Sequence, residues 1–99
     1  MQSASIGRIV HVTVNPADNN GSDIAAAIVT RTWGEPFTNE RDELGERQTI
    51  NVRVLLDQRE TPWHTSIELF ADRPSLEALD ARNPHAEGRH TVAFWPPRT

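Results

Sequence analysis

Short runs of alternating hydrophobic and polar residues, separated by turn-forming residues, limit most strongly how this chain can fold. In the first run Val10, Val12 and Val14 share one face of an extended chain, while His11 and Thr13 share the other. A period of two is typical of a β-strand with one buried face. The runs that predict strands cover residues 6–14, 23–33, 49–57, 63–70 and 90–95.

The segments between these runs carry turn and helix signals. Residues 15–22 contain Asn20-Gly21, a pair suited to the positive φ angles of a hairpin tip. Residues 34–48 are polar and charged, and we expect them to form a long solvated loop. Residues 72–82 predict one short helix, with an aspartate as its first residue and cap.

The number and order of these elements favour a small barrel. The chain has 99 residues, 36% of them hydrophobic, so we expect one domain (1–99) with a small core. Five short antiparallel strands in such a chain are typical of a closed barrel. The helix precedes the last strand, as in SH3-like barrels. The sequence therefore predicts a mainly β fold, a five-stranded antiparallel SH3-like barrel with one short helix, with an OB-like barrel as the alternative.

Strict alternation also predicts where the ends of two strands point. Along 23–33 it places Arg31 and Trp33 on the same face as Val29. Along 63–70 it places Trp63 on the same face as Ile67.

Composition excludes several classes of protein and site. The absence of cysteine excludes disulfides and thiolate zinc sites. No secretory signal or apolar run of about 18 residues is present, so we expect a cytoplasmic protein with no membrane partner. A net charge of −4 argues against duplex DNA as a partner. With so lean a core, a homo-oligomer is as compatible with the sequence as a monomer.

Motifs for catalysis and metal binding are missing. The four histidines, two of which are His11 and His64, lack the compact spacings of metal-ligand sets, and we expect neither metal nor cofactor. No nucleophile motif is present, and lysine is absent altogether. The sequence therefore favours a non-catalytic protein. A phosphodiesterase in which His11 and His64 act as general acid and base is the catalytic alternative.

Tryptophan and arginine residues carry the strongest functional signal. Trp33, Trp63 and Trp95 all lie at the ends of predicted strands, with arginines near them in the chain. An indole beside a guanidinium suits a base and a phosphate at once. The same residue types anchor protein interfaces. The candidate ligand-binding residues are Arg8, His11, Arg31, Trp33, Arg53, Trp63, His64 and Arg89.

Four segments give the chain a resemblance to a known group of proteins. The chain opens with a Gly-Arg-Ile-Val-His strand, continues with an Ala-Ile-Val strand that ends in tryptophan, and closes with a Trp-Pro tail. The four segments are residues 6–11, 26–33, 50–54 and 92–98. In these the chain resembles small phage- and prophage-encoded β proteins of uncertain function. The resemblance implies a viral accessory role, such as a virion or assembly part, a binder of a host protein, or an anti-defence protein.

Two functional interpretations stand nearly level, the first slightly ahead. The first is a non-catalytic phage-type accessory protein that binds a small anionic ligand and sequesters a nucleotide immune signal. Convergence of the candidate arginines and a tryptophan in one pocket would support it. The second is a protein-interaction or virion-assembly module that uses Phe37 and the charged loop 34–48. A flat apolar patch without a pocket would support that interpretation.

Overall fold

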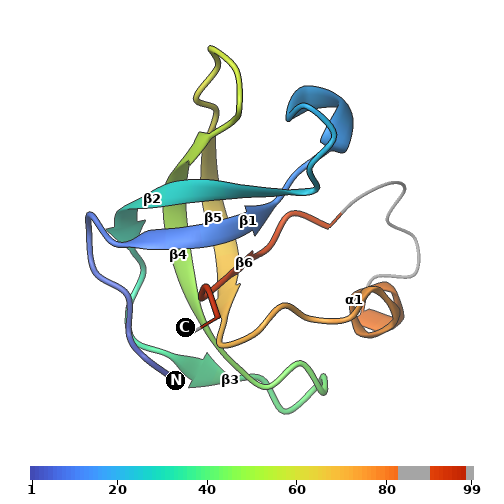
Figure 1. Cartoon of the computed structure of the whole chain (residues 1–99). Coiled ribbons are helices and arrows are strands. Elements are labelled where there is room, and N and C mark those ends of the chain that lie inside the picture. The colour runs from blue at the N-terminus through green and yellow to red at the C-terminus, as the bar shows by residue number, and fades with distance from the viewer. Residues whose placement is uncertain (83–89, 98–99) are drawn as a thin grey trace.

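The computed structural model of the chain describes residues 1–82 and 90–97 (Figure 1). In these residues it contains strands, one α-helix and one short 3-10 helix. In chain order they are β1 (Ile9–Thr13), the 3-10 helix (Pro16–Asp18), β2 (Ile24–Thr32), β3 (Phe37–Thr38), β4 (Glu46–Leu55), β5 (Trp63–Phe70), α1 (Leu76–Arg82) and β6 (Ala93–Phe94).

Five of the strands close into a barrel, and this confirms the predicted fold class. Around the ring, β2 pairs with β1, β1 with β6, β6 with β5, β5 with β4, and β4 again with β2. The short β3 pairs with the beginning of β4, outside the ring. The barrel strands follow one another in chain order, and α1 precedes the last of them, which is the order that favoured an SH3-like over an OB-like barrel.

One pairing differs from the all-antiparallel expectation. β5 and β6 are parallel, with Leu69 opposite Ala93 and Phe70 opposite Phe94. In a closed ring, strand directions can alternate throughout only if the number of strands is even, so a ring of five must contain a parallel pair. The chain places that pair where α1 forms the crossover connection that parallel neighbours require.

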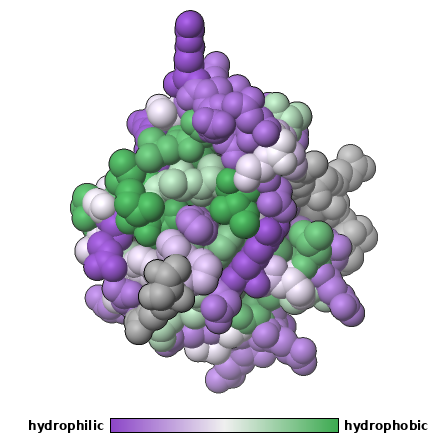
Figure 2. All heavy atoms as spheres, in the orientation of Figure 1, coloured by the Kyte–Doolittle hydropathy of each residue, from purple (hydrophilic) through white to green (hydrophobic). Residues whose placement is uncertain are grey.

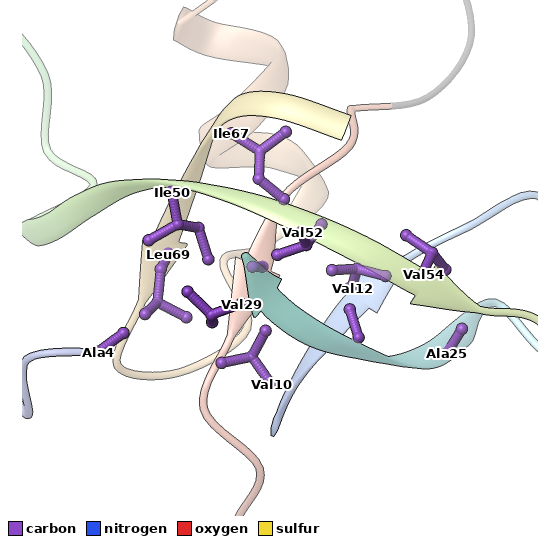
Figure 3. Packing of buried hydrophobic residues seen from close by; sticks show 12 residues of the cluster. Ala4, Val10, Val12, Ala25, Val29, Ile50, Val52, Val54, Ile67 and Leu69 are labelled. Carbon is purple, nitrogen blue, oxygen red and sulfur yellow. The ribbon is translucent and has the colours of Figure 1, made fainter. Parts of the chain in front are cut away.

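Alternating aliphatic residues fill the barrel, as Figure 3 shows for the packed side chains of β1, β2, β4 and β5. Val10 and Val12 of β1 and Ile50 and Val52 of β4 are fully buried, which confirms the alternation predicted for these two strands. Burial of one such side chain contributes about 1.5–3 kcal/mol to folding.

The turn between β1 and β2 adopts the expected conformation. Asn20 and Gly21 have φ angles of 48° and 91°. The Asn20 amide also donates to the backbone carbonyl of Asp57 at 2.7 Å, so this turn is tied to the end of β4.

Two β-bulges break the alternation near the tryptophans. The pairing of β2 with β4 skips Thr30, and the pairing of β5 with β4 skips residues 65–66. A bulge shifts the inward–outward alternation by one residue. Arg31 and Trp33 are therefore exposed on the outside of the barrel, whereas Val29 is fully buried. The predicted common face for these three residues is wrong.

The same correction applies to the fourth predicted strand. Ile67 is buried, whereas Trp63 is 51% exposed and lies opposite the exposed Arg53. The bulge at residues 65–66 separates the two faces, so Trp63 and Ile67 do not share one.

The long connection contains fewer loop residues than the predicted 34–48 loop. The short strand β3 lies within this segment. The next strand, β4, begins at Glu46, and its residues Arg47 and Gln48 are only 1% exposed. The Gln48 side chain accepts a hydrogen bond from the backbone of Ala4 at 2.7 Å and donates to the Gly34 carbonyl at 2.9 Å. Polar side chains can be buried when their hydrogen bonds are made.

Two element boundaries near the C-terminal end also differ from the prediction. The helix begins at Leu76 rather than at residue 72, because the Ser75 hydroxyl accepts the Ala78 N–H at 3.1 Å and acts as the cap. The last strand is confined to Ala93–Phe94, shorter than the predicted 90–95. No helix in the part of the chain that the structure describes is long and apolar enough to cross a membrane.

Arg47 points to the outside of the barrel but is covered by its neighbours, and it links the β3–β4 connection and α1 to the barrel. Arg47 forms a two-pronged ion pair with Asp42, with nitrogen–oxygen distances of 2.8 and 2.7 Å. Its Nε lies 2.6 Å from Glu68 Oε2, and Glu68 also pairs with Arg82 of α1. The network thus joins the residue 39–44 segment, β4, β5 and α1.

This network predicts how stability depends on pH. The hydrogen bond from Arg47 lowers the pKa of Asp42 below its ordinary value. Because the folded-state pKa is depressed, the stabilisation is present above the unfolded-state pKa and is lost as the pH falls through the folded-state value. We expect the stability gap between wild type and Asp42→Asn to be widest near pH 7 and to shrink below about pH 4. Urea unfolding from pH 7 to pH 2 measures it, and a gap that stays constant would contradict the assignment.

Candidate functional site

Four of the predicted ligand-binding residues lie together on the outside of the barrel. Arg53 of β4 is opposite Trp63 of β5, and Arg31 of β2 is opposite Asn51, two residues before Arg53. Trp33 continues from β2, and its backbone N–H bonds to the Thr49 carbonyl at 2.9 Å. We call this surface of β1, β2, β4 and β5 the outer face.

The apolar half of the outer face consists of Ile9, Ala26, Ile28, Leu55 and Trp63. Cross-strand pairing places Ile9 beside Ile28, and Ala26 beside Leu55. Ile9, Leu55 and Trp63 are 46%, 40% and 51% exposed. Figure 2 shows hydrophobic side chains gathered over β1 and β2 on the side that faces the viewer. An exposed apolar patch of this kind typically marks an interaction site.

The polar half of the outer face is organised by Asn51, which is only 6% exposed. Its Oδ1 accepts hydrogen bonds from Trp33 Nε1 at 2.8 Å, Ser66 N at 2.8 Å and Thr65 Oγ1 at 3.0 Å. An indole N–H and a backbone N–H can only donate. They therefore fix which end of the Asn51 amide is the acceptor.

The polar half includes Ser66, whose backbone has an uncommon conformation. Its φ of 56° lies in the left-handed region, which residues other than glycine rarely adopt. The residue sits in the β5 bulge, and its N–H is held by Asn51. Strained residues and bulges are both enriched at binding sites.

The charge of the outer face is opposite in sign to that of the chain. The Arg31 guanidinium lies over the Trp33 ring, 3.7 Å from its centroid. Arg53 donates to the Thr61 carbonyl at 3.2 Å. Within residues 1–82 and 90–97 neither arginine makes an ion pair. The face is therefore locally positive, although the net charge is −4.

Of the other predicted residues, Arg8 and His64 line cavities away from these four residues, and His11 lies at the edge of the outer face. Arg8 lies over Trp95 at 5.4 Å, in a groove of about 660 Å³ that Ile9 of the apolar half also lines. His11 lies on the outside of β1, opposite Ala26 of the apolar half, and its ring meets Phe94 edge-on at 5.6 Å. His64 is opposite the buried Val52 and lines a different cavity, of about 400 Å³.

His11 and His64 therefore lie on different faces of the barrel wall, and the structure does not bring them together. The eighth predicted residue, Arg89, lies outside the described residues. Phe37, predicted as a protein contact, is 43% exposed, with its ring 5.6 Å from the Arg47 guanidinium.

Asn51, Thr65 and Ser66 were missed by the sequence analysis. One signal was present: asparagine is depleted in strands, yet Asn51 interrupts a run of β-branched residues. The bond from Trp33 to Asn51 joins residues 18 apart on different strands, and no sequence pattern indicates it.

Acidic and histidine side chains give no metal site in the described residues, where no group of three or more is placed to hold an ion. Comparison with known proteins also brings no match: no family model fits the chain, and no curated protein or solved structure is similar to it. The candidate site therefore rests on the geometry of the outer face.

Proposed function

We propose that this protein is a protein-interaction module whose outer face binds a segment of a partner protein that carries both apolar and acidic side chains. The observation that carries the proposal is an outward-facing row of side chains across four neighbouring strands. Ile9, Ile28, Arg53 and Trp63 follow one another in it by direct cross-strand pairing. Tryptophan and arginine are the residues that most often dominate binding energy at protein interfaces.

The openness of the face supports a protein partner over a small ligand. Small-molecule sites are usually concave and bury most of the ligand. The grooves at Trp95 and at His64 are not lined by Arg31, Trp33, Arg53 or Trp63. An exposed patch whose arginines and tryptophans lie outside these grooves favours the interaction module, so our proposal reverses the order of the two interpretations from sequence.

The charge of the face supports an acidic partner. Arg31 and Arg53 border the apolar half and have no carboxylate partner within the described residues. A partner with carboxylates beside an apolar anchor would complement this pattern and would be steered toward it. A virion-assembly part or a host-factor inhibitor is the setting that the sequence resemblance implies.

A second candidate function is the sequestration of an anionic nucleotide. The observation that favours it is the Arg31 guanidinium stacked on Trp33 at 3.7 Å, because bases stack on both groups. The experiment below therefore has a nucleotide arm.

The test is selection of peptides from a random displayed library on the immobilised protein. We expect enriched peptides that combine an aromatic or aliphatic residue with aspartate or glutamate. Trp63→Ser should weaken their binding by about 30-fold or more, the range of an interface hot spot. Arg53→Gln should weaken it less and reduce its salt dependence.

The matched controls lie off the outer face. Leu76 is 66% exposed on α1, and Arg59 is exposed in the β4–β5 turn. Leu76→Ser and Arg59→Gln should leave peptide affinity unchanged. Peptides that bind Trp63→Ser as well as wild type would overturn the proposal. A thermal-melt rise of 10 °C or more with one class of nucleotide, about what saturating ligand gives, would favour the second candidate instead.

A further inference from the structure

We infer that the polar half of the outer face contains a carboxylate-binding subsite built from the Asn51 amide and the Arg31 guanidinium. The inference rests on the proposed function, because it names the group of the partner segment that this half would take. Arg31 and Asn51 are direct cross-strand partners, so their side chains leave the sheet side by side.

The first half of the subsite is a fixed, unused donor. Asn51 Oδ1 already accepts three hydrogen bonds, from Trp33, Thr65 and Ser66. Its Nδ2 makes no hydrogen bond within the described residues. Asn51 Nδ2 does not belong to the fully buried side-chain atoms of these residues that lack a hydrogen bond, so part of it contacts solvent. The three bonds to Oδ1 hold this N–H donor in place before any ligand arrives.

The second half is a guanidinium in a restrained orientation. The Arg31 guanidinium lies over the Trp33 indole at 3.7 Å, and Trp33 is itself held by Asn51. Stacking limits the rotamers of a long side chain, so less entropy is lost when a ligand binds. A guanidinium stacked by its face keeps its N–H edge for a carboxylate.

The surroundings exclude a cation and match a singly charged anion. Beside Asn51, the Ser66 hydroxyl donates to the Thr65 hydroxyl at 3.3 Å, because the Thr65 proton is already donated to Asn51 Oδ1. The nearest acidic residue along β5, Glu68, is engaged by Arg47 and Arg82. One guanidinium with one neutral amide donor balances one carboxylate, whereas a doubly charged phosphate usually takes more cationic or backbone N–H partners.

The probe is sodium acetate, added in exchange for sodium chloride at constant ionic strength and pH 7. Nitrogen-15 NMR follows the Asn51 side-chain NH₂ and the Trp33 indole N–H. We expect saturable shifts of both in wild type. Arg31→Gln and Asn51→Asp should weaken acetate binding about ten-fold, the effect of losing a hydrogen bond to a charged group. Arg59→Gln is the matched control and should bind acetate as wild type does.

Asn51→Asp also separates loss of acetate binding from loss of folding. Aspartate retains the oxygen that accepts from Trp33, Thr65 and Ser66 and replaces the donor with a second acceptor. The indole N–H resonance of Trp33 should therefore stay at its hydrogen-bonded position in this variant. Shifts that do not saturate, or that survive in Asn51→Asp, would overturn the subsite. Tighter binding of inorganic phosphate than of acetate would overturn its assignment to carboxylates.

The two proposals fail separately. Peptide selection that depends on Trp63, together with no acetate binding, would remove the subsite and leave the protein-interaction function. Acetate binding at Asn51 without any selected peptide would leave an anion site and remove the proposed protein partner.

Discussion

Replacing Arg47 with methionine is expected to lower the free energy of unfolding by about 3–5 kcal/mol, the range for breaking a buried ion pair by removing one partner. The Arg47 side chain is 1% exposed, and those of Asp42 and Glu68 are 11% and 17% exposed. Methionine fills much of the space of the aliphatic stem but leaves Asp42 without its cation. Glu68 keeps Arg82, so the loss falls mainly on the residue 39–44 segment.

Urea unfolding at pH 7 measures the effect, and the melting temperature should fall by more than about 10 °C for a domain of this size. Arg41→Met is the matched control, since Arg41 is exposed in the same connection and, within residues 1–82 and 90–97, only its backbone N–H is bonded, to Asn39. The double variant Asp42→Leu with Arg47→Met should recover part of the loss, because no unpaired carboxylate then remains. A loss below about 1 kcal/mol in Arg47→Met would show that the network does not hold the connection to the barrel.

Arg47 also illustrates where sequence reasoning stops. Charge at residues 40–47 predicts solvent exposure, and Glu40, Arg41, Glu43 and Glu46 are exposed as expected. Arg47 differs because Asp42, five residues before it, Glu68 of β5 and two phenylalanine rings surround it. A charge pattern along the chain does not show which charges will meet in space.

The barrel itself could be predicted because its signal is local. Val10 and Val12 in β1, and Ile50, Val52 and Val54 in β4, alternate without interruption and fill the interior. The helix before the last strand is also visible in the sequence, and it accounts for the parallel β5–β6 pair. The bulge at Thr30 could not be predicted, because one inserted residue leaves the composition and propensity of β2 unchanged.

The bulge at Thr30 determines which residues lie together in the candidate site. Without it Arg31 and Trp33 would share a face with the buried Val29, inside a barrel too small for either. With the bulge, they lie beside Arg53 and Trp63 on the outside of the barrel. Four predicted residues therefore come together because of a bulge, which the sequence alternation does not reveal. Arg8 and His64 carry the same chemical signal but line other cavities, since nearness to a strand end does not fix a face. His11 lies on the outside of β1, beside Ala26 and against Phe94.

Asn51 should be the most sensitive position of the outer face itself. Asn51→Leu is expected to lower the free energy of unfolding by about 2–3 kcal/mol, because it leaves the Ser66 N–H and the Trp33 indole N–H without their acceptor. Ser66 would then keep its φ of 56° without the bond that holds it, which adds to the cost. Urea unfolding measures the loss, with Thr49→Val as the control on the same face of β4.

Comparison of Asn51→Leu with Asn51→Asp separates the two roles of this residue. Asn51→Asp keeps the acceptor and should lose less than about 1 kcal/mol, since hydrogen bonds to a charged group are strong enough to offset much of its burial. If both variants unfold equally easily, the Asn51 oxygen does not organise the polar half. If neither is destabilised, the bulges hold their shape without it. Loss of stability in Asn51→Leu alone means that the oxygen builds the site and that the nitrogen is left for a ligand.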